Sequence, residues 1–298
     1  MLLHLQLNQT KMKQQNLHRL FFLACCIGTL PVSAQTSSGK LSLNKGLKLQ
    51  VDNSVKLVST MELMGQSMEI TSDAVMLKQV EVKEKKDTSY IISSIITKIT
   101  TNGNAMGQSF SFDSEKKEDY DTEIGKAMKG QVNVPQEIEL NHQGMVTTVK
   151  KDTASTDSDN PMMDMMKSMG GGAYDENSGA DAFQVLPAGK KNGDTWMDSV
   201  ITEGIKTYRT YTIKEINGND ATVTLSGTQQ TSKKVENQGM EVNVTMEAKL
   251  SGEAVVDMST GIVKQKTFIM EGSGSADAMG QAIPMTTKVT TVTTVKSL

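Results

Sequence analysis

The sequence is poor in the side chains on which most active sites depend. Its 298 residues include two cysteines, three histidines and one tryptophan, and aromatic residues make up only 4%. After the N-terminal region, no run is long and apolar enough to cross a bilayer as a helix. Acidic and basic residues nearly balance, at 34 against 31, whereas nucleic-acid binding requires clustered positive charge. We therefore expect neither an integral membrane protein nor a nucleic-acid-binding one.

The first 34 residues have the pattern of a secretory signal peptide. A polar, basic stretch (11–19) precedes the apolar run 20–30, and small residues then lead to Ala34. This order predicts cleavage between Ala34 and Gln35. We expect an exported protein that is periplasmic, associated with the outer membrane, or secreted.

Two alternatives at the N-terminus stay open. In a lipoprotein signal, Cys25 would be acylated and would become the mature N-terminus, although Phe22 stands where an aliphatic residue is usual. The true start is either Met1 or Met12.

Cleavage after Ala34 would remove both cysteines and two of the three histidines, leaving His142 as the sole imidazole. A Ser-His-Asp triad would have to use His142, and a zinc site with several histidines is excluded. All 34 acidic residues would remain against 28 basic ones, because three of the 31 basic residues lie in the signal: Lys11, Lys13 and Arg19.

Most of the remaining chain alternates apolar and polar residues with a period of two. For example, Leu47, Leu49 and Val51 alternate with polar residues, and Val55 and Leu57 share one face of the next stretch. This period is typical of antiparallel strands with one buried and one solvated face. The run 289–295 consists of valine and threonine, which favour strands, and is the expected last strand.

Turn signals separate the predicted strands. Residues that favour hairpin turns recur at Asn102 and Gly103, at Asn217 and Gly218, at 142–144 and at 259–261. The phrase Ala-Met-Gly-Gln occurs at 105–108 and 278–281, with a partial copy at 64–66, each at an expected hairpin tip. We interpret His142 as a turn residue rather than a catalytic one.

These patterns predict a mainly β protein, a curved antiparallel sheet or open barrel made of two related halves, with one short Met-rich helix between them. The expected organisation is signal peptide 1–34, first β-rich half 35–150, connector 151–182 and second β-rich half 183–298.

The connector holds the least common feature of the sequence, a cluster of methionines. Asn160 is a suitable N-cap, Pro161 suits the first helical position, and Gly170 suits the end of a two-turn helix. The methionines of this predicted helix are Met162, Met163, Met165, Met166 and Met169. Three interpretations stay open for them: plain packing, contact with an apolar ligand or partner, and Cu(I) binding through thioethers.

No other constellation indicates chemistry. The acids in 175–181 lack the spacing of a calcium-binding loop, and the acidic run 115–123 is interpreted as a solvated loop. We expect no enzymatic activity and no cofactor.

Three segments carry a resemblance to a known family. They are Phe183 to Pro187, the turn Gly193-Asp194-Thr195-Trp196, and Asp257 to Val263 with its Asp-x-x-Thr-Gly pattern. This spacing resembles a family of exported bacterial proteins known only as a domain of unknown function. The resemblance implies no catalytic residues, and we interpret all of these residues as marks of the fold.

A weaker resemblance, at the level of fold, is to periplasmic carriers of lipids and lipoproteins. It implies a curved antiparallel sheet closed by short helices over an apolar hollow. We expect a non-enzymatic binding module that shelters an apolar ligand, a lipid or a lipoprotein segment, against the sheet and the Met-rich helix. A structural or interaction protein of the cell envelope with no small-molecule site is the alternative.

The signal peptide generates a first prediction. Intact-mass spectrometry of the protein recovered from an exporting bacterial host should place the mature N-terminus at Gln35. A mass that corresponds to acylated Cys25 would contradict this and would establish a lipoprotein.

Overall fold

The computed structural model describes residues 39–63, 65–105, 107–151, 178–202, 204–237, 240–278 and 281–298. All of them belong to one compact unit, Thr36–Leu298. Before the connector the elements are β1 (Lys48–Leu63), β2 (Gln66–Lys85), β3 (Ser89–Ala105), β4 (Gln108–Asp113), η1 (Lys117–Asp121), α2 (Glu123–Met128), β5 (Pro135–Asn141) and β6 (Val146–Lys151). After it come η3 (Ser178–Ala182), β7 (Thr195–Thr202), β8 (Ile205–Asn217), β9 (Asp220–Asn237), β10 (Met240–Asp257), β11 (Val263–Ala278) and β12 (Gln281–Ser297).

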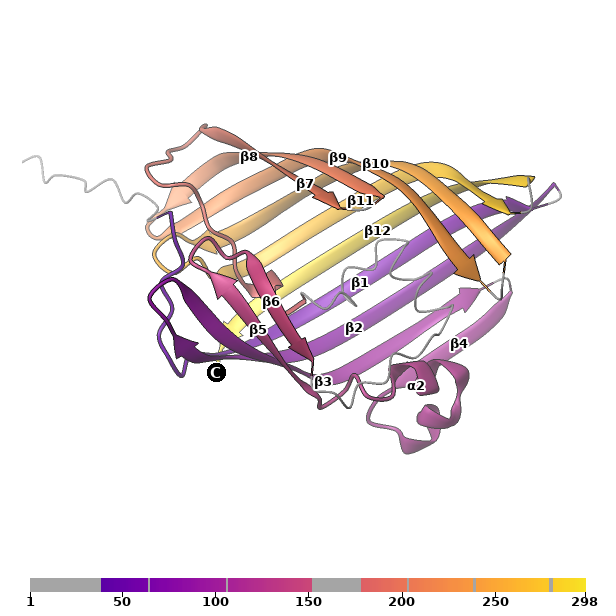
Figure 1. Ribbon diagram of the computed structural model, residues 1–298, viewed down its shortest axis with the longest axis horizontal. Helices are drawn as coiled ribbons and strands as arrows, with labels where there is room; N and C mark the ends of the chain where they lie inside the picture. The colour runs from indigo at the N-terminus through magenta and orange to yellow at the C-terminus, as the bar shows by residue number, and fades with distance from the viewer. Residues whose placement is uncertain are drawn as a thin grey trace, which may run out of the picture. The chain divides into compact units, whose positions relative to one another are not determined.

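The strands form one antiparallel sheet that does not close on itself (Figure 1). Its order is β6-β5-β3-β2-β1-β12-β11-β10-β9-β8-β7, with β4 beside β3. The first and last strands are therefore neighbours, in a register that sets Val51 opposite Val295 and Leu57 opposite Val289. The two edges, β6 and β7, are consecutive in the chain. The predicted curved antiparallel sheet is confirmed as a single sheet that contains both predicted halves.

The expected hairpin tips are mostly correct. Gly65 and Gly107 lie in the turns that follow β1 and β3, and Gly218 lies between β8 and β9. The turn expected at Asn102 and Gly103 is wrong, because both residues lie inside β3 and pair with β2 and β4.

Glycines on the inner face, the face that carries the buried side chains, explain how the strands approach so closely. At four of them an added Cβ would collide with a backbone carbonyl of the adjacent strand: Gly103, Gly227, Gly252 and Gly274. At Gly252 that Cβ would lie 2.5 Å from the Thr267 oxygen. Glycine inside a strand marks such close approaches and bends.

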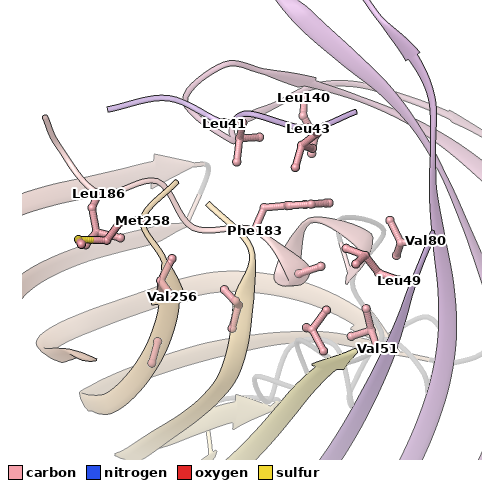
Figure 2. Packing of buried hydrophobic residues seen from close by; sticks show 14 of the residues in the cluster. Leu41, Leu43, Leu49, Val51, Val80, Leu140, Phe183, Leu186, Val256 and Met258 are labelled. Carbon is pink, nitrogen blue, oxygen red and sulfur yellow. The ribbon is translucent and has the colours of Figure 1, made fainter. Parts of the chain in front are cut away.

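One end of the inner face is filled by two segments outside the sheet. Leu41 and Leu43 precede β1, and Phe183 and Leu186 follow η3. They belong to one buried cluster, the first core cluster, together with residues of nine strands, from Ile138 on β5 to Tyr211 on β8. Figure 2 shows Phe183 in the middle of the cluster, below Leu41 and Leu43, with Leu186 beside Met258. Since both flanks of the sheet contribute to one cluster, the sheet curves around these segments.

The turn between β10 and β11 holds both segments in place. The Thr260 carbonyl accepts a hydrogen bond from the Ser42 amide (3.1 Å), and the Gly261 carbonyl accepts one from the Gln184 amide (2.8 Å). Asp257 shapes the turn by accepting hydrogen bonds from the Ser259 and Thr260 amides at 2.8 and 3.0 Å. Gly261 has φ +79°, which disfavours other residues. The Asp-x-x-Thr-Gly turn is thus a mark of the fold, as predicted.

The acidic run 115–123 is not wholly a loop, which corrects the expectation. It contains η1 and the first residue of α2, whose N-cap Thr122 accepts a hydrogen bond from the Gly125 amide at 3.0 Å. Met128, at the end of α2, is buried. The Met-rich helix predicted at 161–169 lies outside the described residues.

Gly252→Ala should destabilise the protein by about 1–3 kcal/mol, because the added methyl group would collide with the Thr267 carbonyl oxygen, which is held in the neighbouring strand. Urea unfolding measures the difference. Ser251→Ala, at the neighbouring exposed position on the opposite face, is the control and should change the free energy of unfolding little. Equal effects of the two substitutions would contradict the proposed close approach.

Asp257→Ala should lower the free energy of unfolding by about 2 kcal/mol at neutral pH. Burial alone would raise the pKa of Asp257, but hydrogen bonds from Ser259 and Thr260 outweigh it and lower the pKa overall. A carboxyl whose pKa is lower in the folded than in the unfolded protein contributes its full stabilisation when the pH is above the unfolded-state pKa of about 3.9. That stabilisation is lost as the pH falls through the folded-state pKa.

The difference between Asp257→Ala and wild type should therefore stay constant above about pH 5 and shrink below about pH 4. Asp87→Ala, at an exposed turn residue, is the control and should show little difference at any pH. If the difference in free energy of unfolding between Asp257→Ala and wild type stays the same in acid, the proposed role of the ionised carboxylate would be contradicted.

Candidate functional site

The middle of the inner face is the candidate site. Alternation along β1 directs Val55 and Leu57 to this face, and the antiparallel register brings Val289 of β12 opposite Leu57. These residues belong to the second core cluster, which comprises Val55, Leu57, Ala74, Met76, Ile99, Phe112, Met128, Met246, Ala248, Leu250, Met270 and Val289. Strands from both ends of the chain thus form one apolar surface.

Small and flexible side chains characterise this surface on β10 and β11. Ala248 and Gly272 are register partners, as are Met246 and Gly274. The Met246 sulfur lies over Gly272, where an added Cβ would be 2.9 Å from it. Methionine is unbranched and adapts its shape to what it contacts. This part of the surface can therefore accommodate more than one apolar shape.

Most buried polar side chains on the inner face have partners within the protein. The Ser59 hydroxyl donates to the Thr286 carbonyl at 3.0 Å, and the Ser72 and Thr101 hydroxyls lie 3.3 Å apart. Lys78 is fully buried and also has an interaction partner. The fold therefore satisfies inward-facing polar groups where it uses them.

Asn53 and Thr287 differ from this pattern. Both are buried on the inner face, and the Asn53 Oδ1 and Nδ2 atoms and the Thr287 Oγ1 atom have no hydrogen-bond partner among the described residues. A buried polar group without a partner costs about 1–3 kcal/mol. Such groups in a native protein require an explanation, of which a bound ligand or water is the simplest.

The outer face has a different chemistry. Lys288 Nζ lies 2.7 Å from Glu271 Oε1, and Lys296 Nζ lies 3.7 Å from Asp52 Oδ2. The hydrogen bond from Lys288 lowers the pKa of Glu271. An open hollow of about 670 Å³ on this face is lined largely by hydroxyl and charged residues of β1, β9, β10, β11 and β12. The outer face is therefore the solvated one.

A polar and aromatic group fixes edge strand β7 to β8. The Arg209 Nε and Nη2 atoms donate to Asp198 at 2.7 and 3.1 Å, and the Tyr211 hydroxyl donates to Asp198 at 3.2 Å. Burial, opposed by Arg209 and assisted by Asp198, raises the pKa of Tyr211 to about 12. Trp196 stacks on Tyr211 with ring centroids 5.2 Å apart. With the phenol neutral and the carboxylate occupied, this group has the properties of a structural anchor.

The turn before β7 has the structure expected from the sequence. Asp194 Oδ2 accepts a hydrogen bond from the Lys191 amide at 2.9 Å, and β7 begins at Thr195. Gly193 has φ +83°. These residues serve the fold, as predicted from the sequence.

The predicted ligand-binding methionines and the predicted cleavage site lie outside the described residues. The former are Met162, Met163, Met165, Met166 and Met169, and the latter are Ala34 and Gln35. Their roles stay predictions.

His142 lies in the turn that joins β5 to β6, with its ring 5.3 Å from that of Tyr90. The described part of the chain contains no group of three or more His, Cys, Asp or Glu residues that could hold a metal ion. None of its helices combines the length and apolarity of a membrane span.

The orphan groups at Asn53 and Thr287 are the site residues that sequence reasoning missed. A signal was present for the first of them. Asn53 stands on the apolar side of the alternation, between Val51 and Val55, where every other member of the row up to Leu57 is a large aliphatic residue.

Comparison with solved structures gives a likeness of fold. Lipovitellin, in a structure described by its lipid–protein interactions, matches with a TM-score of 0.50 at 13% identity over 86% of this chain. The chain spans only 25% of the lipovitellin chain. An outer membrane channel from Pseudomonas putida F1 matches with a TM-score of 0.22 at 8% identity, over 87% of this chain and 98% of the channel. That value is too low to support an argument.

Sequence comparison identifies the family but no activity. No curated protein shows significant similarity to the chain. The model of a family of unknown function, DUF6263, matches residues 87–263. The match extends into the first half of the chain, beyond the segments between Phe183 and Val263 that carried the resemblance. Since it covers more than half of the sequence, the protein belongs to the DUF6263 family of unknown function.

Proposed function

We propose that this protein is an exported, non-enzymatic binding module that shelters an apolar ligand, such as a lipid or a lipoprotein segment, against the inner face of its sheet. The observation that carries the proposal is the second core cluster. Apolar side chains from strands far apart in the sequence form one surface on a sheet that does not close.

A sheet with one apolar face needs a second layer to cover that face. Among the described residues, the helical elements are η1, α2 and η3, which contain five or six residues each. Elements of this length are too short to form a layer over a sheet of twelve strands. The members of the second core cluster are at most 8% exposed without a ligand, so we infer that a ligand would take the place of cover that the chain itself supplies.

The first core cluster limits where the ligand would lie. Leu41 and Phe183 fill the inner face near the turns that contain His142 and Thr260. The remaining inner face extends along β1 toward Gly65, at the hairpin tips. We infer that the ligand would occupy this half, where Met246 and Met270 contribute adaptable side chains.

The likeness to lipovitellin supports the proposal at the level of fold only. The matched lipovitellin structure is described by its lipid–protein interactions, and similar folds often serve different functions. The absence of enzymatic activity and the export are likewise proposals. They derive from the composition and from the signal-like pattern of residues 1–34.

A structural or interaction protein of the envelope is the second candidate, and the edge of the sheet favours it. The exposed fractions of Met197, Ile201 and Tyr208 on β7 and β8 are 79%, 64% and 49%. An edge strand with exposed apolar side chains is a template for pairing with another chain.

Val289→Thr tests the binding function. This substitution keeps the shape of the side chain and puts a hydroxyl into the second core cluster, where Val289 is buried. The affinity for diphenylhexatriene, a purely apolar fluorescent probe, should fall several-fold, because the probe would contact a hydroxyl in place of a methyl group and lose about 1 kcal/mol of apolar contact. Fluorescence titration measures the change.

Val292→Thr is the matched control, since Val292 lies on the same strand with its side chain on the opposite face. It should leave the affinity unchanged. A wild-type protein that binds no probe and releases no lipid on organic extraction would contradict the proposal and favour the interaction protein.

A further inference from the structure

We propose that Asn53 and Thr287 form hydrogen bonds to polar groups of the bound molecule, which is therefore an amphiphile rather than a plain hydrocarbon. This inference rests on the binding function proposed above and names the class of ligand. The group that Asn53 would recognise donates and accepts hydrogen bonds side by side, as an acyl amide or a protonated carboxylic acid does.

Asn53 lies at the centre of the sheet. Its register partners are Met76 on β2 and Thr293 on β12. Its exposed fraction is 1%, and its neighbours on the same face of β1 are Val51 and Val55. A carboxamide is thus held among apolar residues, on the strand pair that joins the two ends of the chain.

The carboxamide of Asn53 forms no hydrogen bond that would stabilise the described part of the fold. Both of its polar atoms lack partners among the described residues, whereas Ser59, on the same face of the same strand, donates to a backbone carbonyl. A leucine, which has the same number and branching of side-chain heavy atoms, would bury more apolar surface and leave no polar atom unpaired. A residue that is unfavourable for the fold alone marks a site where another molecule supplies the missing contacts.

Thr287 extends the pattern along β12. It pairs with Ser59 and Gly272, has an exposed fraction of 4%, and its hydroxyl is also without a partner in the described part of the chain. Six residues separate it from Thr293, which corresponds to about 20 Å along a strand. Val55, Leu57 and Val289 lie between these two levels, together with Thr291. This mainly apolar interval suits an extended acyl chain with a polar group at Asn53.

The chemistry of Asn53 determines the specificity. A carboxamide offers an acceptor oxygen and two donor hydrogens, so an amide or acid group can satisfy both atoms together. A hydrocarbon would leave them unpaired and would be rejected relative to the amphiphile.

Asn53→Leu tests the inference through displacement of diphenylhexatriene by palmitamide and by palmitic acid. The variant should bind both amphiphiles about tenfold more weakly, as expected for loss of a buried hydrogen-bonded pair. Its affinity for diphenylhexatriene should stay within twofold of wild type, and its thermal midpoint without ligand should be equal or higher. A loss confined to palmitamide would assign the acyl amide, and a loss confined to palmitic acid would assign the fatty acid.

Thr287→Val is a second, isosteric variant and should weaken binding of 16-hydroxypalmitic acid, which has a second polar group at the far end of its chain, several-fold, with no change for palmitic acid. Ser59→Ala is the matched control, because that hydroxyl already has a partner, and it should leave affinity unchanged. Unchanged amphiphile affinity in Asn53→Leu would overturn the inference and would leave a buried water as the partner of Asn53. A lower thermal midpoint with equal loss for all probes would overturn it by making Asn53 structural. Failure of wild type to bind any probe would instead refute the proposed function itself.

Discussion

The pairing of β1 with β12 is the constraint on which the rest of the structure depends. It joins the first and last strands in the interior of the sheet and moves the break in the sheet to the connector, between β6 and β7. Without this pairing, Val55 and Leu57 would not be continuous with Val289 and Met270. The apolar inner face exists as one surface because strands from the two ends of the chain share a register.

The alternation of polar and apolar residues along each strand gives the two faces of the sheet different chemistry. Lys288 and Glu271 form an ion pair on the outer face, while their neighbours Val289 and Met270 are buried on the inner one. The glycines that allow close strand approach, such as Gly252, lie on the inner face, where residues from both flanks of the sheet share one cluster with Leu41 and Phe183. Curvature, a solvated exterior and an apolar interior thus follow from period-two patterning interrupted by small residues.

Much of this architecture is predictable from the sequence, because it is local. Alternation identifies the strands, and the repeated Ala-Met-Gly-Gln phrase marks hairpin tips. Gly103 shows where local reasoning fails: its dipeptide with Asn102 signals a turn, but the glycine is required by contact with β2, a neighbour in space.

The β1–β12 register and the unpartnered amide of Asn53 cannot be predicted from local sequence patterns, because both depend on contacts between residues that are far apart in the sequence. Alternation shows that Asn53 points inward, yet only the three-dimensional arrangement shows that nothing in the described chain bonds to it. The methionines at 162–169, the most conspicuous sequence feature, lie outside the described residues, and their role rests on the sequence alone.

The central position of the terminal strands also has a kinetic consequence. Contacts between β1 and β12 span almost the whole polypeptide, so the ladder in the middle of the sheet cannot form until the last strand has been synthesised. Pairings this distant in sequence close slowly. A partly made chain therefore keeps β1 without one of its two neighbours until β12 is complete, and the edge of β1 stays open to other pairings for that time.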